Sequence, residues 1–181
     1  MSEKPRILKS PVNGATPKIH PSAFIAPSAT IIGDVEIGEN TNIWFNVVIR
    51  AEAGKIKIGK NCSIQENIVI HTEPGTELTI ADNVLMGHCA MVHGPGSIGS
   101  NVMIGISATV LQGHKIEDGV VIAAGAVARG HYEPMAMYAG KVKAERIKDV
   151  KKSDVRLLQT GLTFYVENGR KFKAMFEDLK E

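Results

Sequence analysis

The sequence predicts a mainly β protein, a left-handed parallel β-helix of six-residue repeats followed by one C-terminal α-helix. Three observations lead to this prediction. An aliphatic residue recurs at every sixth position, two short insertions interrupt this period three repeats apart, and the period gives way near the C-terminus to apolar residues at helical spacing. A period of six fits neither an α-helix nor hairpin strands, but it is typical of a coil whose rungs bury their aliphatic side chains against one another.

Residues 1–18 precede the repeat and are expected to form an N-terminal extension. They lack the apolar region of a signal peptide, and no apolar run in the 181 residues approaches the roughly 18 that suggest a membrane span. The net charge is +2 and the charges are interspersed, so no basic stripe suited to a phosphate backbone is present. We therefore expect a soluble, cytoplasmic protein with neither nucleic acid nor membrane as a partner.

Residues 19–133 carry the repeat and are expected to form six three-sided coils. The repeating position is occupied by Ile19, Ile25, Ile31, Ile37, Ile43, Ile49, Ile58, Ile64, Ile70, Ile80, Met86, Val92, Ile98, Ile104, Val110, Ile116, Ile122 and Ala128. A small or β-branched residue such as Ala23 or Ala90 mostly follows four positions later and marks a second inward position. The insertions follow the repeats that start at Ile49 and Ile70, which are three repeats apart. Both insertions should therefore leave the same corner of the coil.

The period is lost after Pro134, and residues 134–152 are expected to connect the coil to a helix over 153–180. Ser153 is the predicted N-cap of this helix. The apolar residues at helical spacing are Val155, Leu158, Leu162, Tyr165, Val166, Phe172, Met175, Phe176 and Leu179. We expect this amphipathic helix to pack along the coil or against a neighbouring subunit.

Three residues inside the repeat region are interpreted as structural. Cys62 and Cys89 are not spaced as a CxxC pair and are expected to be small packing residues. His114 stands at a position expected to be small and inward, and it is interpreted as a core or corner histidine.

The repeat register brings two histidines together. His71 directly follows Ile70 in one coil. His93 directly follows Val92 in the next coil. Both repeats occupy the third face, so the two imidazoles should stack at the strand spacing of about 4.8 Å and reach one metal ion. His88 lies on the second face, one position later in its repeat, so we expect another subunit to supply it.

Three such coils packed about a threefold axis would complete a three-histidine site at each subunit interface. The sequence therefore predicts a homotrimer with metal sites between its subunits. Neutral imidazole ligands with an open fourth position favour Zn²⁺, and Fe²⁺ or Co²⁺ would accept the same ligands. The alternative is a purely structural role for all three histidines.

Four segments around these histidines carry a family resemblance. The first is residues 43–50, which contain Ile-Trp and Val-Ile-Arg. The second is residues 63–72, which contain Ser-Ile-Gln-Glu-Asn and Val-Ile-His-Thr. The other two are residues 86–94 and 104–113. Together they resemble the γ-class carbonic anhydrases and the ferripyochelin-binding-protein-like relatives of the hexapeptide-repeat superfamily, over about residues 17–147. The spacing of His71, His88 and His93 is the discriminating part. The resemblance implies a zinc-dependent lyase in which a metal-bound hydroxide attacks CO₂ to give bicarbonate, reversibly.

The resemblance also implies roles for residues beside the histidines. Gln65 matches a glutamine that hydrogen-bonds the metal-bound solvent, and the register places it one position before the column that holds Glu66 and His88. Arg50 stacks beneath His71 and matches an arginine whose interface ion pair shapes the site. A simple salt bridge between subunits is an equal interpretation of Arg50.

The residues that would move protons depart from the family pattern. Glu52 stands where the family commonly has aspartate, and Ala53 stands where the best catalysts carry an acidic residue. Glu73, on the short loop after His71, is a candidate proton relay or else a solvated turn residue. Tyr165 resembles an active-site tyrosine, and a helix-core residue is an equal interpretation.

Three other functions stay open from the sequence. The protein could instead use the same metal site to cleave acyl-CoA thioesters, as relatives with this architecture do. A metal-independent hexapeptide acyltransferase would use one histidine as general base and a CoA groove between coils, leaving the other two histidines unexplained. A catalytically weak trimeric scaffold is favoured by the absence of an acidic residue at Ala53.

Overall fold

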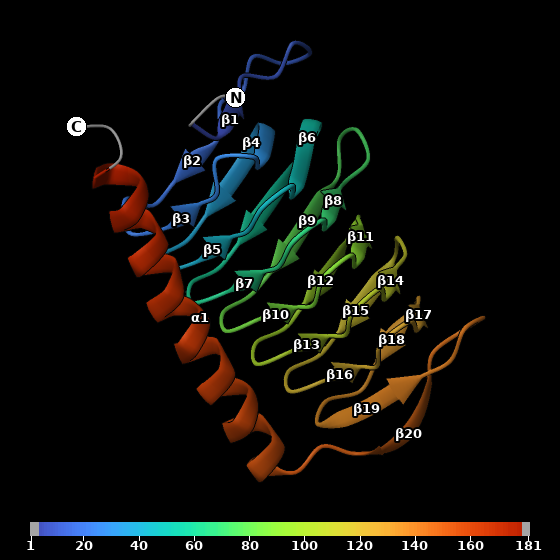
Figure 1. Cartoon of the computed structure of the whole chain (residues 1–181). Helices are drawn as coiled ribbons and strands as arrows, with labels where there is room; N and C mark the ends of the chain where they lie inside the picture. Colours follow the sequence, from blue (N-terminus) through green and yellow to red (C-terminus); the bar gives the residue numbers. More distant parts are fainter. Residues whose placement is uncertain (1–3, 179–181) are drawn as a thin grey trace.

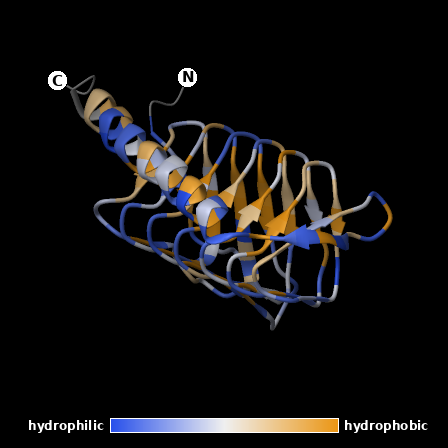
Figure 2. Ribbon diagram, turned by 90° about the horizontal axis from the view of Figure 1, so that it is seen from below, coloured by the Kyte–Doolittle hydropathy of each residue, from blue (hydrophilic) through white to orange (hydrophobic). Residues whose placement is uncertain are grey.

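The computed structural model describes residues 4–178 and confirms the predicted fold, a left-handed parallel β-helix with an α-helix at its C-terminal end (Figure 1). From Ile31 to Ala128, every residue of the predicted aliphatic series is at most 4% exposed. Ile19 and Ile25, near the open N-terminal end, are only partly buried. Figure 2 shows hydrophobic residues concentrated along the strands, and mostly hydrophilic or neutral residues at the turns. The period of six therefore encodes one continuous column of stacked aliphatic side chains.

Each face of the coil carries seven rungs within residues 4–178. Face one consists of β2 (Lys18–Ile19), the end of β4 (Thr30–Ile37), the end of β6 (Val48–Ile58), β9 (Glu77–Ile80), β12 (Gly96–Ile98), β15 (His114–Ile116) and β18 (His131–Tyr132). Face two consists of β3 (Phe24–Ile25), β5 (Asn42–Ile43), β7 (Ser63–Ile64), β10 (Leu85–Met86), β13 (Met103–Ile104), β16 (Val121–Ile122) and β19 (Ala136–Ala139), with β20 (Glu145–Asp149) antiparallel to β19. Face three consists of β1 (Arg6–Leu8), the starts of β4 and β6, β8 (Val69–His71), β11 (Met91–His93), β14 (Thr109–Val110) and β17 (Val127–Ala128).

The coil continues beyond the predicted repeat at both ends. Strand β1, from the predicted N-terminal extension, pairs in parallel with β4 and sets Ile7 opposite Ile31. At the other end, Tyr132 and Tyr138 occupy the next inward positions of faces one and two, with ring centroids 4.8 Å apart. The sequence pattern missed this last rung because its inward residues are aromatic and Tyr132 follows Ala128 by four positions rather than six.

Backbone in the left-handed conformation turns the chain at two corners. φ is positive at Asn40, Asn61, Asn83 and Asn101 between faces one and two, and at Asn46, Asn67, Cys89 and Ser107 between faces two and three. Asparagine tolerates this conformation, and its amides also bond from rung to rung, as between Asn40 and Asn61 at 3.4 Å. Cys89 is exposed at its corner, so its interpretation as a packing residue is wrong. Cys62 is buried, and burial raises the pKa of its thiol to about 12.

Helix α1 (Lys152–Asp178) begins one residue earlier than predicted and is capped differently. The Asp154 carboxylate accepts a hydrogen bond from the Lys151 N–H at 2.9 Å, so Lys151 is the cap residue and Ser153 lies inside the first turn. The prediction of Ser153 as N-cap is therefore wrong. Leu179 and the predicted helix end at 180 lie outside the described residues.

Helix α1 runs back along the coil from β20 toward β3 and packs on face two (Figure 1). Gly169 permits a close approach, because a Cβ there would lie 3.1 Å from the Cβ of Asn42 and 3.3 Å from the Cβ of Phe24. The aromatic cluster at this contact contains Phe24, Trp44, Phe45, Tyr165, Phe172 and Phe176. Within residues 4–178, no helix is both long enough and apolar enough to cross a membrane.

His114 lies inside the coil, 2% exposed, which agrees with its interpretation as a core histidine. It pairs with Gly96, and a Cβ on that glycine would overlap the imidazole ring. The His114 Nδ1–H donates to the carbonyl oxygen of Leu111 at 2.9 Å, while Nε2 is buried without a hydrogen-bond partner in the described part of the chain. The glycine therefore makes room for the ring, and burial lowers the pKa of His114 below its ordinary value of 6.5.

This histidine predicts a loss of stability in acid. Below about pH 6.5 the unfolded chain takes up a proton that the folded chain binds only at lower pH, so the free energy of unfolding should fall as pH decreases, by at most about 1.4 kcal/mol per pH unit. Urea unfolding at a series of pH values measures the slope. The variant His114→Phe keeps a ring but cannot titrate there, so its slope should be smaller. Equal slopes in the two proteins would contradict this assignment.

Candidate metal centre

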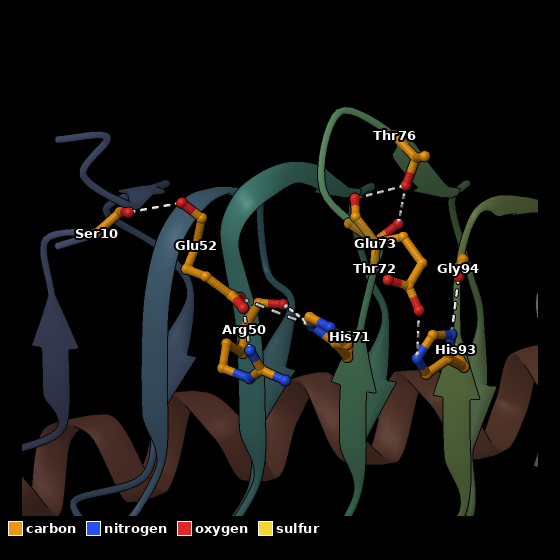
Figure 3. A network of polar contacts seen from close by, with 9 residues as sticks. All are labelled: Ser10, Arg50, Glu52, His71, Thr72, Glu73, Thr76, His93 and Gly94. Carbon is orange, nitrogen blue, oxygen red and sulfur yellow. Dashed lines mark hydrogen bonds and ion pairs between the residues drawn. The ribbon is translucent and has the colours of Figure 1, made fainter. Parts of the chain in front are cut away.

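His71 and His93 are stacked at the ends of two neighbouring rungs of face three, where the register predicts them. His71 ends β8, His93 ends β11, and the two residues pair directly in the parallel ladder. Their ring centroids lie 5.2 Å apart, edge to face (Figure 3). Arg50, one rung earlier, pairs with His71 in the same outward column. The strict repeat therefore sets two imidazoles side by side on the outer surface of the coil.

Both imidazoles are held by backbone carbonyls. The Nδ1–H of His71 donates to the oxygen of Arg50 at 2.8 Å, and the Nδ1–H of His93 donates to the oxygen of Gly94 at 2.8 Å. A carbonyl can only accept, so each neutral ring carries its proton on Nδ1 and leaves the Nε2 lone pair free. Metal-ligating histidines are oriented by this kind of outer hydrogen bond.

Two carboxylates flank the imidazole pair (Figure 3). Glu52 forms an ion pair with Arg50, and its Oε2 lies 3.9 Å from Nδ1 of His71. This oxygen is buried and has no hydrogen-bond partner within residues 4–178. On the other side, Oε1 of Glu73 lies 3.5 Å from Nε2 of His93, and the Glu73 side chain is 52% exposed. The structure thus brings both predicted acids to the pair.

The N-terminal extension reaches this site through Ser10. The hydroxyl of Ser10 donates to the main-chain oxygen of Glu52 at 2.6 Å and accepts from the N–H groups of Val12 and Asn13. Ser10 is 2% exposed. Sequence reasoning missed it because it lies outside the repeat. The turn-forming Pro-Val-Asn-Gly that follows Ser10 was the available signal.

His88 lies at a different place, on the corner between faces two and three. Its Nδ1 is 2.8 Å from Oε2 of Glu66, which is an acceptor when ionised, so Nδ1 carries the proton here too. The backbone N–H of His88 donates to Oε1 of Gln65 at 3.2 Å, and Gln65 is 4% exposed. Three predicted site residues therefore form a second, separate group.

No three His, Cys, Asp or Glu side chains of residues 4–178 gather as a metal site within one chain. The chain instead presents two parts, the imidazole pair His71 and His93, and the single imidazole of His88. All three rings direct Nδ1 at an oxygen and form no hydrogen bond through Nε2 within residues 4–178, while the Glu73 carboxylate lies 3.5 Å from Nε2 of His93. Three imidazole nitrogens suit a borderline metal such as Zn²⁺.

Tyr165 lies on α1 and packs in the aromatic cluster between this helix and face two. Its ring centroid lies 6.2 Å from that of Trp44 and 5.7 Å from that of Phe164. These two ring contacts pack the helix. Ala53 contributes its carbonyl oxygen to the N–H of Gly75 at 2.8 Å, which stacks the second insertion on the first.

Two family models match the repeat. The model described as bacterial transferase hexapeptide (six repeats) matches residues 16–51, and the model described as hexapeptide repeat of succinyl-transferase matches residues 95–127. Both matches lie in the coil.

Comparisons with whole proteins extend over the site, two of them along nearly the whole chain. A carbonic anhydrase of Geobacillus kaustophilus is 37% identical over 167 residues, which cover 91% of each chain. The mitochondrial gamma carbonic anhydrase 1 of Arabidopsis thaliana is 32% identical over 62% of this chain and 43% of its own length. A solved Bacillus cereus structure, named for an acetyltransferase, is 32% identical with a TM-score of 0.89, covering 95% of this chain and 99% of the other.

Proposed function

Because the chain belongs to the γ-class carbonic anhydrase-like family of hexapeptide-repeat proteins, we propose that it is a metal-dependent lyase that interconverts CO₂ and bicarbonate. One observation carries the proposal. His71, His88 and His93 each direct Nδ1 at an oxygen, and none of the three forms a hydrogen bond through Nε2 within residues 4–178, with the Glu73 carboxylate 3.5 Å from Nε2 of His93. If one of these histidines acted alone as a general base, the other two would have no reason to orient their rings in the same way.

The proposed enzyme is a homotrimer in which His88 of one subunit meets His71 and His93 of the next. Exposed apolar side chains accompany both parts of the site. Val69, two residues before His71 on face three, is 43% exposed, and Ile106, one rung above the His88 corner, is 52% exposed. Burying these side chains between copies would favour the same contact that completes the ligand set.

The metal would supply Lewis acidity, which lowers the pKa of a water molecule toward neutrality. The residues of the chain hold and orient the reactants. Gln65 accepts from the His88 N–H with its Oε1, so its amide N–H groups remain to position solvent or substrate. Glu52 is held by Arg50, and the half-exposed Glu73 is the group placed to pass a proton toward solvent.

Stopped-flow CO₂ hydration on protein of known metal content tests this function. Activity should disappear on chelation and return when Zn²⁺, or Fe²⁺ under anaerobic conditions, is restored in proportion to bound metal. Inactivity with both metals bound would rule out the carbonic anhydrase proposal.

The similarity to a structure named for an acetyltransferase makes acyl transfer the second candidate. Assays of acyl-CoA hydrolysis and of acyl transfer from acetyl-CoA, run on the same preparations with and without metal, separate the alternatives. Acyl transfer that survives chelation would favour a metal-independent acyltransferase. Thioester cleavage that requires metal would favour a thioesterase at the same site.

Glu66 is predicted to tune metal affinity through His88. Its Oε2 lies 2.8 Å from Nδ1 of that histidine. Replacing Glu66 with alanine should weaken metal binding by about 10- to 100-fold, because the ring loses the partner that orients it. Glu66→Gln retains an acceptor oxygen and should lose less. Competition with a chromophoric chelator measures the affinities, and unchanged affinity in Glu66→Ala would contradict the role.

A further inference from the structure

A cavity of about 360 Å³ lies between the N-terminal half of α1 and face two, outside the proposed metal centre. Its principal lining residues are Leu85, Met103, Val121, Met137, Leu158 and Gly161. A volume of this size lies at the lower end of the range of small-molecule sites, which is about 300–1,000 Å³. Most of the lining is apolar on both the sheet side and the helix side, and its polar members are Asn101, Lys148 and Asp154.

The cavity arises because the two halves of α1 pack differently. The C-terminal half lies close to β3, β5 and β7, where the missing side chain of Gly169 permits near contact of the backbone with Asn42 and Phe24. The N-terminal half lies over the outer side chains of β10, β13, β16 and β19, and the cavity opens between them. Leu157, at its edge, is 74% exposed.

Gly161 keeps one wall of the cavity open. It lies well inside the 27-residue helix, where glycine costs about 1 kcal/mol relative to alanine. No described atom outside its own helix turn lies within 4 Å of the Cβ that another residue would place there. At Gly169 the helix packs so closely on face two that a larger residue would be crowded, whereas at Gly161 no such contact requires a glycine. The helix therefore omits a side chain where one would fill the cavity.

The chain segment that leads from β20 into α1 beside the cavity is basic. Lys148 lines it and forms no ion pair within residues 4–178, and Lys151 and Lys152 follow at the start of the helix. The one acidic residue in the lining, Asp154, accepts a hydrogen bond from the Lys151 N–H. The nearby Asp149 is paired with Arg146. Lys148, Lys151 and Lys152 thus bring three positive charges to this segment, against the one negative charge of Asp154 in the lining.

We propose that this cavity binds an amphiphile with a single apolar chain and an anionic head group. The chain lies between Met103 and Met137 on the sheet and Gly161 on the helix, and the head group lies at Lys148. Methionine side chains adapt to chains of differing length. This site is separate from the proposed metal centre and does not depend on its activity.

The test uses the full-length, metal-loaded protein and decanoate below its critical micelle concentration, with decanol as the uncharged match. Titration calorimetry should give one decanoate per chain, bound about tenfold more tightly than decanol because of the charge-assisted contact. Methyl NMR resonances of Met103 and Met137 should shift on binding. Lys148→Met should lower decanoate affinity to that of decanol.

The variant Gly161→Leu should abolish binding of both ligands and raise the thermal midpoint, since it fills the cavity and favours the helix. Gly161→Ala adds one methyl group in open space, so it should also stabilise the helix but retain binding. Decanoate binding that persists in Gly161→Leu would overturn the proposal. So would absence of binding to the unaltered protein, or a native trimer that dissociates in Gly161→Leu, because the cavity would then be a contact between subunits.

Discussion

The variant His88→Ala is expected to lose both metal and CO₂ hydration, although every chain keeps the His71 and His93 pair. Two imidazoles alone form an incomplete catalytic site, which ordinarily has three protein ligands. Since the His88 side chain is 45% exposed at a corner, its removal should leave the coil folded. Metal analysis after gel filtration should find little bound metal. The matched control His20→Ala removes an exposed histidine bonded to Ser22 and should retain full occupancy.

Mixing subunits tests the origin of the third ligand. A double variant, His71→Ala with His93→Ala, should also bind no metal by itself. Trimers formed from the two inactive proteins should regain metal at interfaces where an intact His88 meets an intact pair. Tight metal binding by the His88 variant alone would contradict His88 as a ligand. Mixed trimers that fail to regain metal would contradict its assignment to another subunit.

The periodic part of the fold was predictable from the sequence because the pairing register follows from the six-residue spacing of the aliphatic residues. Three repeats make a turn, so the pairing of His71 with His93 and of Arg50 with His71 could be derived before any coordinates. The two insertions leave the corner between faces three and one, as predicted. The same counting separates His88 from the pair.

The parts that depend on irregular chain or on main-chain atoms were not predictable in this way. Ser10 reaches Glu52 from outside the repeat, and the acceptors of His71 and His93 are carbonyl oxygens, which every residue carries. The rung containing Tyr132 was missed because spacing contracts there. Side-chain type alone could not identify these contacts.

Gly33→Ala is predicted to be the most damaging small change in the coil. Gly33 lies where β4 turns from face three to face one, with φ at +86°, and pairs with Ala51 of β6. A Cβ at this position would overlap the Ala51 carbonyl group, with its carbon at 2.6 Å. Backbone atoms cannot rotate away as a side chain does. Strain from the left-handed conformation and from overpacking together should cost about 3–5 kcal/mol of unfolding free energy.

The matched variant Gly75→Ala separates these two causes. Gly75 has a similar φ of +70°, but nothing lies within 4 Å of its would-be Cβ, so only the conformational cost of about 1–2 kcal/mol should appear in urea unfolding. Gly33→Ala should additionally weaken metal binding, because Ala51 follows Arg50, whose carbonyl oxygen holds the imidazole of His71. Equal destabilisation in the two variants would mean that β6 shifts to make room for the added methyl group. The prediction that backbone overlap at Ala51 destabilises the coil would then be wrong.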